Sequence, residues 1–313
     1  MDPTSSKRER ATEPEQTREE EPRVTTEGSD GEASCTVRVV EAEALGFLGS
    51  LTSESIPMVY VDPPFNTGKR QELNRTRTSR DADGDRVGFG GQRYRSESIS
   101  KMGYLDSYSD YLEFLGPHLE EAKRVLQSDG SLFVHLDARE IHYAKVFLDG
   151  LFGRDRFMNE IIWAYDFGGR SRSKWSSKHD SILWYAKDPK NYTFRFKDMD
   201  RIPYMAPGLV GPEKAKRGKT PTDVWWNTIV STAGKERTGY PNQKPRAILD
   251  RLVRVHSNPG DTVLDFFAGS GTTGEAAWEL GRSAILVDQN PEAIEVIRVR
   301  LATANPSFER FEI

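Results

Sequence analysis

The sequence predicts an α/β protein built on a doubly wound sheet, and two observations support this class. Short apolar runs typical of buried strands alternate along the chain with segments whose apolar residues recur at helical spacing. The pattern G-x-G-x-x-G, at 269–274, stands between one such run and one such segment. A glycine-rich turn in that position is typical of doubly wound sheets, so both observations indicate the same fold class.

The first half of the chain carries expected strands and helices in alternation. A strand at 58–62 is of the type that lies inside a parallel sheet, because its apolar residues follow one another without alternation. The helix expected at 111–126 should end at Asp129-Gly130. The other elements expected here are a strand at 37–40, a short helix at 42–51, a strand at 131–136 and an amphipathic helix at 138–150.

The second half begins with two apolar runs, at 160–165 and 181–186, which flank a polar stretch and predict a long hairpin. Residues 188–240 are rich in Pro, Gly and Lys and carry no clear element. The remaining expected elements are a helix at 245–255 with proline in its first turn, a strand at 262–266, a helix from the glycine turn to Gly281, a strand at 283–287 and a helix at 291–301.

Two segments lack the pattern of a packed element. Residues 1–35 are rich in Glu, Thr, Ser, Arg and Pro and nearly free of large apolar side chains, which predicts a disordered acidic tail. Residues 66–103 are rich in Arg, Gly, Ser and Asp without periodicity. They predict a long basic loop, either functional or disordered.

The composition of the 313 residues excludes several classes of protein. The lone cysteine, Cys35, rules out a disulfide framework and a Cys-rich zinc site, and no His/Cys/Asp cluster has metal-ligand spacing, so no metal is expected. No apolar run reaches the ~18 residues of a membrane span, and the polar N-terminus lacks the apolar core of a secretory signal. A cytoplasmic protein without membrane association is therefore expected.

Charge is unevenly distributed along the chain. The net charge is -4, but residues 1–35 carry ten acids and five bases, which leaves about +1 on the rest. Two segments are locally basic: 66–103 has nine Lys/Arg against five Asp/Glu, and 154–240 has seventeen against ten. Because local fields attract polyanions more effectively than net charge does, a nucleic-acid partner is compatible with the sequence.

The glycine turn predicts a site for an adenosine-bearing cofactor. Asp288 lies 19 residues after Gly269, at the end of the next expected strand, where an acidic side chain accepts hydrogen bonds from ribose hydroxyls. No Lys-[Ser/Thr] pair follows the last glycine, which excludes a P-loop. NAD and S-adenosylmethionine both fit such a turn. Asp265 at its mouth would repel a pyrophosphate but suit the ammonium of a methionine moiety, which favours S-adenosylmethionine.

Asp62-Pro-Pro-Phe65 directly follows an apolar, strand-like run. Asp-Pro-Pro is common in turns, so the stretch alone is compatible with a capped turn. Two prolines also stiffen the backbone, so the same stretch could hold a carboxylate and an aromatic ring rigidly at a sheet edge. The glycine turn in the same chain favours this second interpretation.

Four motifs together resemble those of the amino-group DNA methyltransferases. Asp62-Pro-Pro-Phe65 is similar to their catalytic motif, (D/N/S)-P-P-(Y/F), and Asp265 to Gly271 resembles their cofactor motif, F-x-G-x-G preceded by an acid. Tyr240-Pro-Asn-Gln-Lys-Pro245 is similar to their T-Q-K-P stretch, and Lys178-His-Asp-Ser-Ile-Leu183 resembles their His-acid-apolar strand. The catalytic motif comes first and the cofactor motif last, as in the β group. The resemblance covers roughly residues 37–304.

The chain departs from the family pattern at three places. Ala42-Glu43 stands where Gly-Asp is usual, Asn242 replaces Thr, and Phe65 replaces the commoner Tyr. The last change keeps a stacking ring and loses a hydroxyl. The catalytic region is also similar to that of type III modification subunits, which are longer.

The resemblance implies a Rossmann-like S-adenosylmethionine-dependent methyltransferase fold with a circularly permuted motif order. It implies methyl transfer from S-adenosylmethionine to the exocyclic amine of a flipped base in double-stranded DNA. Asp at position 62 favours adenine N6, with cytosine N4 as the alternative. The expected organisation is a tail at 1–35, a catalytic half at 36–153, a hairpin and target-recognition region at 154–240 and a cofactor-binding half at 241–313.

The resemblance also implies which residues form the site. Asp62 and the carbonyl of Pro63 are expected to accept the two N–H groups of the amine, with Pro64 fixing the turn and Phe65 stacking on the base. The residues expected to bind the cofactor are Glu43, Gln243, Lys244, Asp265, Phe266, Phe267, Gly269, Gly271, Thr272 and Asp288.

Basic residues in two segments are candidates for DNA contact, with a solvated surface as the alternative for both. They are Lys69, Arg70, Arg75 and Arg77 in the basic loop, and Arg170, Arg172 and Lys174 in the hairpin connection. A homodimer and a cognate restriction endonuclease are further candidate partners that the resemblance suggests.

Two other classes of protein stay open. An NAD-dependent oxidoreductase would bind NAD instead of S-adenosylmethionine, although the chain offers it no convincing acid/base pair. A non-catalytic DNA-binding module would keep the fold and leave DNA unmethylated, although Asp62 and the cofactor glycines are intact.

Overall fold

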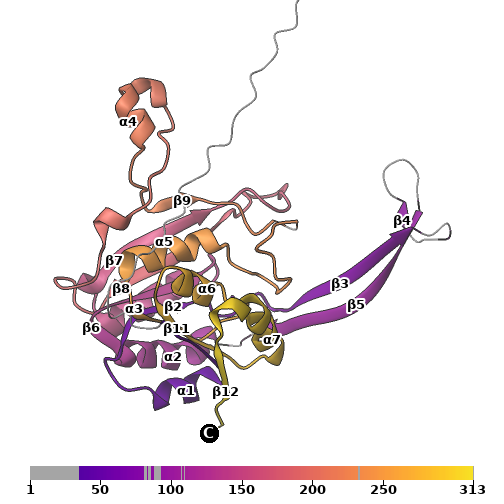
Figure 1. Ribbon diagram of the computed structural model, residues 1–313, viewed down its shortest axis with the longest axis horizontal. Coiled ribbons are helices and arrows are strands. Elements are labelled where there is room, and N and C mark those ends of the chain that lie inside the picture. The colour runs from indigo at the N-terminus through magenta and orange to yellow at the C-terminus, as the bar shows by residue number, and fades with distance from the viewer. Residues whose placement is uncertain are drawn as a thin grey trace, which may run out of the picture. The chain divides into compact units, whose positions relative to one another are not determined.

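A nine-stranded sheet runs through the described part of the chain, with helices on both faces (Figure 1). The computed structural model describes residues 35–80, 83, 86–87, 93–106, 108, 110–231 and 233–312, without the side chains of 69–80, 86–87, 94 and 96–105. The predicted acidic tail lies outside these residues, apart from Cys35. In spatial order the strands are β12 (Ser307–Arg310), β1 (Val37–Glu41), β11 (Ser283–Asp288), β10 (Thr262–Asp265), β2 (Ile56–Val61), β6 (Leu126–Leu136), β8 (His179–Ala186), β7 (Phe157–Ala164) and β9 (Val224–Trp226).

The sheet is mixed. Neighbouring strands from β12 to β6 are all parallel. β8 is antiparallel to both β6 and β7, which confirms the predicted hairpin, and β9 is parallel to β7. The parallel part carries the glycine turn, and the antiparallel strands form one edge.

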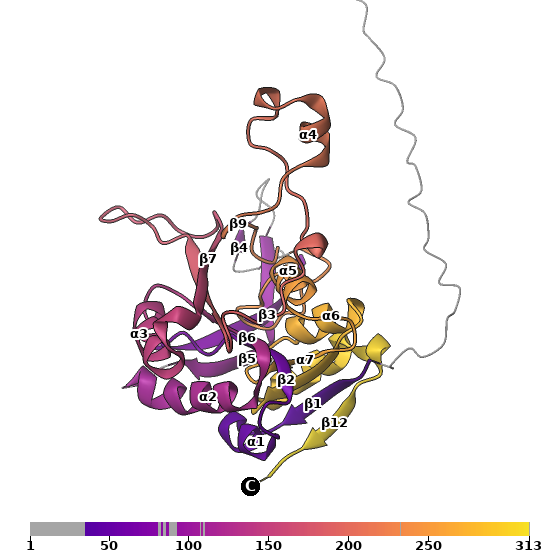
Figure 2. The same ribbon diagram turned by 90° about the vertical axis from the view of Figure 1, so that its left-hand side faces the viewer.

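Two apolar cores lie on opposite faces of the sheet, beneath the helices that Figure 2 shows on either side of it. In β2, Val59 and Val61 face one core, while Met58 and Tyr60 face the other. A strand buried on both faces needs apolar residues throughout, which explains the unbroken run in this segment. The first core is covered by α1 (Ala44–Ser50), α2 (Tyr111–Val125) and α3 (Ile141–Phe152), and the second by α5 (Arg246–His256), α6 (Thr272–Glu279) and α7 (Pro291–Arg300).

Most of the predicted elements are confirmed to within a few residues, with two differences in the sheet. α2 ends at Val125 and β6 begins at once, so Asp129-Gly130 lies within a strand instead of ending the helix. β12 was not predicted. It is a short edge strand with a largely polar sequence that pairs with β1, and edge position removes the need for apolar residues.

The prediction of a long loop at 66–103 is wrong. β3 (Lys69–Arg80) and β5 (Arg93–Asp106) pair antiparallel over their length, and β4 (Arg86–Val87) adds to β5. Together they form a separate sheet, an arm that extends away from the main sheet (Figure 1). A ladder of this kind is held by backbone hydrogen bonds and does not require an apolar face against a core. The sequence therefore shows no alternation that could reveal it.

The stretch 188–240 has little regular structure among its described residues. Its elements besides β9 are the 3-10 turns η2 (Phe196–Asp198) and η3 (Pro207–Leu209) and the short helix α4 (Pro212–Arg217). Two further 3-10 turns, η1 (Arg154–Arg156) and η4 (Ala302–Ala304), precede β7 and β12.

Gly274 lies where α6 packs closely on the sheet, so a substitution at this position tests that packing. A Cβ at Gly274 would lie 2.4 Å from Cδ1 of Leu286, a fully buried side chain of β11. Gly274→Ala is therefore expected to lower the free energy of unfolding by about 1–3 kcal/mol, the usual effect of overpacking. Gly150→Ala in α3 is the control, because a Cβ there meets nothing within 4 Å and alanine favours helix. Denaturant unfolding compares the two, and equal stability would contradict this packing.

Candidate active site

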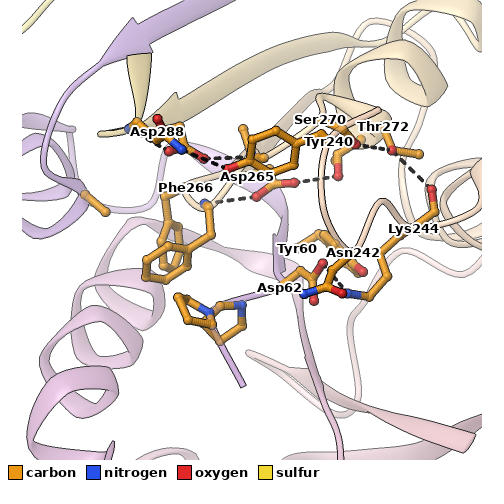
Figure 3. A pocket seen from close by; sticks show the side chains of 18 of the residues that line it. Tyr60, Asp62, Tyr240, Asn242, Lys244, Asp265, Phe266, Ser270, Thr272 and Asp288 are labelled. Atoms are coloured by element: carbon orange, nitrogen blue, oxygen red, sulfur yellow. Dashed lines mark hydrogen bonds and ion pairs between the residues drawn. The ribbon is translucent and has the colours of Figure 1, made fainter. Parts of the chain in front are cut away.

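A cavity of about 350 Å³ opens where β2, β10 and β11 end, and it brings the two sequence motifs together (Figure 3). These strands are neighbours in the sheet and run in the same direction. Their carboxyl ends therefore lie at one edge, although β2 and β10 are far apart in the sequence. The lining includes Asp62 to Phe65, the glycine turn, the loop before α5 and the first residues of α1.

Asp62 stands at the carboxyl end of β2 and is paired with a lysine. Lys244 Nζ lies 2.7 Å from Asp62 Oδ2, and the two side chains are 9% and 18% exposed. Asp62 Oδ1 is buried and accepts no hydrogen bond from the described residues. Because buried acceptors are nearly always hydrogen-bonded, this oxygen marks a carboxylate with unused acceptor capacity.

The turn after Asp62 is held by contacts from α2 and from the chain beyond it. The Tyr111 hydroxyl donates to the Pro64 carbonyl at 2.6 Å. Asn66 has a φ of +54° and donates to Glu140 at 2.8 Å. Phe65 is partly buried, with the Lys244 ammonium 4.5 Å from its ring centre. These contacts fix the carboxylate and the ring relative to each other.

The glycine turn joins β10 to α6. Gly269 and Gly271 have φ values of +50° and +74°, which favour glycine. The Asp265 carboxylate accepts hydrogen bonds from the Phe267 backbone N–H at 3.1 Å and the Thr273 hydroxyl at 2.6 Å. Burial raises the pKa of Asp265 to about 7, against these two hydrogen bonds and with the charges of neighbouring carboxylates. This side chain therefore gains from a cationic ligand.

Asp288 ends β11 beside the same turn. Its carboxylate accepts hydrogen bonds from the backbone N–H groups of Gly269 and Asn290, both at 2.8 Å. Burial raises the pKa of Asp288 to about 6 despite these bonds. Each oxygen keeps a second lone pair, so the side chain can still accept a ligand hydroxyl.

Aromatic rings and Glu43 line the other end of the cavity. Phe267 packs near His118 and Phe266, with ring centres 5.4 Å and 5.2 Å away. Phe266 itself is fully buried. Glu43 caps α1 by accepting from the N–H groups of its first turn, at 2.9 Å and 2.7 Å, and it also lines the cavity.

The loop before α5 contributes two of the predicted cofactor residues in different ways. The Gln243 side chain bonds within its own loop, to Thr238 and to the carbonyl of Glu236. Lys244 instead points across the cavity to Asp62 (Figure 3), and its carbonyl accepts from the Thr272 hydroxyl at 3.2 Å. The sequence motif thus indicated a loop that lines the cavity, but it did not reveal the carboxylate that its lysine contacts.

The predicted DNA-contact residues are not part of the cavity lining. Arg170, Arg172 and Lys174 are exposed in the connection between β7 and β8, where Arg170 lies 3.2 Å from Asp166. Lys69, Arg70, Arg75 and Arg77 belong to β3 by their backbone, and their side chains lie outside the described residues.

A buried polar chain behind Phe65 was missed in the sequence. Tyr60 lines the cavity, and its hydroxyl lies 2.7 Å from His135 Nδ1. His135 Nε2 is 3.5 Å from Asp180, which accepts from the Tyr165 hydroxyl at 3.1 Å. The His135 ring centre lies 5.9 Å from that of Phe65. A histidine inside an otherwise apolar strand was the one available signal.

Two solved structures show the same fold. The crystal structure of the M1.HpyAVI–SAM complex matches with a TM-score of 0.54 at 18% identity, covering 85% of this chain and 99% of that chain. PvuII DNA methyltransferase (cytosine-N4-specific) matches with a TM-score of 0.56 at 17% identity, covering 88% and 95%. The fold is therefore the mixed α/β sheet of S-adenosylmethionine-dependent DNA methyltransferases.

Sequence comparison gives the family. Residues 56–299 match the family described as DNA methylase, of the N6/N4 type. Type II methyltransferase M.HpaI of Haemophilus parainfluenzae is 32% identical over 279 residues, covering 88% of this chain and 77% of the relative. DNA adenine methyltransferase YhdJ of Escherichia coli (strain K12) is 28% identical over 282 residues, covering 85% and 83%. The chain belongs to the N6/N4 amino DNA methyltransferase family, which depends on S-adenosylmethionine.

The charges of the cavity fit this cofactor. The acidic side chains that line it are Glu43, Asp62, Asp265 and Asp288, against a single lysine among the described residues. Such a lining disfavours a pyrophosphate and favours a ligand with a sulfonium and an ammonium group. Asp288 can accept from ribose hydroxyls, and the aromatic end suits an adenine ring. Within the described ranges, no group of His, Cys, Asp or Glu is placed to hold a metal ion, and no helix is long and apolar enough to cross a membrane.

The raised pKa of Asp265 predicts that cofactor affinity depends on pH. Because its pKa is raised to about 7, it is largely neutral at pH 6 and ionised at pH 7.5, and only the ionised form pairs with an ammonium. Binding of S-adenosylmethionine is expected to tighten by roughly five- to tenfold over this interval, with Asp288 acting in the same direction. Calorimetry measures the dissociation constant of S-adenosylmethionine at the two pH values. Asp265→Asn should bind more weakly and flatten the pH dependence, and an unchanged dependence in that variant would contradict the assignment.

Proposed function

We propose that this DNA methyltransferase transfers the methyl group of S-adenosylmethionine to N6 of an adenine flipped out of double-stranded DNA. The observation that carries the proposal is the placement of Asp62 and Phe65. A carboxylate acceptor and an aromatic ring, both held rigidly, stand at the rim of a cavity suited to the cofactor.

The chemical problem is the weak nucleophilicity of an exocyclic amine, whose lone pair is delocalised into the base. Asp62 and the Pro63 carbonyl would accept its two N–H bonds and draw the nitrogen towards tetrahedral geometry. The negative oxygens would also stabilise the positive charge that develops on the nitrogen during attack. S-adenosylmethionine, when bound, supplies an electrophilic methyl group on a sulfonium sulfur.

The turn at 62–65 supplies alignment. The base would stack on Phe65, since the amine cannot be reached inside a duplex. The hydrogen bond from Tyr111 to the Pro64 carbonyl holds the turn, and the two prolines stiffen its backbone. Both effects keep the acceptors aimed at one point. Holding the nitrogen in line with the methyl group supplies much of the rate enhancement in reactions of this type.

Adenine N6 is proposed ahead of cytosine N4. The residue that favours it is Asp at position 62, and the relative YhdJ is named a DNA adenine methyltransferase. Cytosine N4 is the second candidate, because PvuII DNA methyltransferase, which shares the fold, is cytosine-N4-specific.

The DNA would approach the edge of the sheet that carries the cavity. β7 is parallel to β2, because β6 is parallel to β2 and β8 is antiparallel to both β6 and β7. The connection 165–178, with Arg170, Arg172 and Lys174, therefore leaves the sheet at the same edge as Asp62. This supports a target-recognition role for 154–240, between a catalytic half at 36–153 and a cofactor-binding half at 241–313. DNA contact by Lys69, Arg70, Arg75 and Arg77, a homodimer, a cognate restriction endonuclease and a cytoplasmic location stay predictions.

Sequencing with detection of modified bases tests the proposal directly. The chain is expressed in a host free of DNA methylation, and its genome is sequenced. N6-methyladenine at one recurrent sequence is the expected result. N4-methylcytosine would replace the first candidate by the second, and unmodified DNA would contradict both.

Asp62→Ala tests the role of the carboxylate. Loss of one charge-stabilising group is expected to slow methyl transfer by about 10²- to 10³-fold. Binding of S-adenosylmethionine, measured by calorimetry, should persist. Asp155→Ala, at an exposed carboxylate of η1, is the matched control and should keep wild-type turnover. Retained turnover in Asp62→Ala would exclude the proposed role.

A further inference from the structure

The ammonium of Lys244 lies where the target amine of the proposed reaction would have to lie. Nζ is 2.7 Å from Asp62 Oδ2 (Figure 3) and lies 4.5 Å from the centre of the Phe65 ring. A base stacked on Phe65 that donates to Asp62 would place its amine nitrogen at hydrogen-bond distance from the same carboxylate, over the same ring. The ammonium and the amine cannot occupy this position together.

Neither carboxylate oxygen of Asp62 is open to the amine while Lys244 is in place. Oδ1 has almost no exposed surface, so the carboxylate is enclosed on that side. Oδ2 is covered by Lys244, whose side chain is 9% exposed. The backbone of the lysine is tied to the cofactor side of the cavity, because the Lys244 carbonyl accepts from Thr272 at the start of α6. Only the side chain of Lys244 can clear the position.

We propose that Lys244 is a positioning residue that occupies the amine site until the cofactor binds. The inference rests on the proposed function. In the cofactor-free enzyme, Lys244 compensates the buried charge of Asp62. A sulfonium placed beside Asp62 for in-line transfer brings a second positive charge near the ammonium, and like charges repel strongly in a partly buried site. The carboxylate of the methionine moiety offers Lys244 a replacement partner. Both effects move Lys244 away from Asp62, so entry of the base follows binding of the cofactor.

A purely structural ion pair predicts different behaviour. If Lys244 served only to hold Asp62 in place, the pair would persist in every state of the enzyme. Removing the lysine would then weaken base capture, and the cofactor would not change the position of the base. The two roles therefore differ in how base flipping depends on the cofactor, a readout separate from turnover.

Fluorescence beside a flipped base measures this dependence. The duplex carries the recognition sequence found by sequencing, with 2-aminopurine in place of a base next to the methylated one, so that the target keeps its exocyclic amine and its departure from the stack raises the fluorescence. Sinefungin, which carries an amine at the donor position, and S-adenosylhomocysteine, a neutral thioether, serve as cofactor probes. In the wild-type protein, sinefungin should raise the population of flipped base by about tenfold, within the usual range of ligand coupling. S-adenosylhomocysteine should raise it less, because it lacks the positive charge.

Variants at position 244 decide the outcome. Lys244→Met removes the charge at similar length and is expected to flip the base without any cofactor, to the level of the wild type with sinefungin. Lys244→Arg keeps the charge and should keep the dependence. Circular dichroism confirms that each variant is folded, and calorimetry gives the sinefungin concentration that saturates it, since loss of the lysine also removes the proposed partner of the methionine carboxylate. A cofactor-free Lys244→Met protein with no more flipped base than the wild type overturns the inference, as does a wild type that flips the base equally with and without sinefungin. Failure of the proposed function is recognised separately, since the wild type would then methylate no DNA.

Discussion

The parallel alignment of β2, β10 and β11 is the constraint on which the site depends. Met58 pairs with Val263 and Tyr60 with Asp265, while Asp265 pairs with Leu286 of β11. This register brings the carboxyl ends of three strands to one edge. An acidic residue of the cavity stands at each end: Asp62 directly after β2, and Asp265 and Asp288 as the last residues of β10 and β11. Since neighbouring parallel strands lie close together, the order of the motifs along the chain matters little. The catalytic motif can precede the cofactor motif by some 200 residues and still share its cavity.

Convergence of carboxylates at one edge has an electrostatic cost that ligands can relieve. Burial and mutual repulsion raise the pKa of Asp265, and burial raises that of Asp288. Asp62 has a different environment, because the Lys244 ammonium lies 2.7 Å away. Among the described residues, the three carboxylates at the strand ends thus comprise one with an internal counter-ion, Asp62, and two without, Asp265 and Asp288. A cation that enters beside Asp265 supplies what the protein lacks there, and the same cation disturbs the pair at Asp62. The proposed displacement of Lys244 would therefore couple cofactor binding to access to Asp62 through charge.

The sequence predicted the parts of the structure that follow from local rules. Strands buried on both faces and the positive φ of Gly269 and Gly271 leave clear patterns, and these located the cofactor turn. The turn after Asp62 was recognised only because a second motif in the chain gave it context. The arm of β3 and β5 left no pattern, since it does not pack on the main sheet. The contact of Lys244 with Asp62 spans 182 residues and depends on strand order, which periodicity does not reveal.

The direction of the outer strands β7 and β9 places the ends of the target region on the same side of the sheet as the cavity. β7 and β9 run in the direction of β2, so the chain leaves both strands at the edge that carries the cavity. The first exit leads into the basic connection 165–178, and the second leads through the following loop to Lys244. Tyr165, at the start of the first exit, is linked through Asp180 and His135 to Tyr60 on the wall of the cavity. One covalent route, from β9 to Lys244, and one chain of polar side chains, from Tyr165 to Tyr60, therefore connect the proposed target-recognition region to the surroundings of Asp62. A base that enters from this edge and stacks on Phe65 would meet the ammonium of Lys244 over the same ring, so the position of Lys244 would decide whether the base reaches the carboxylate.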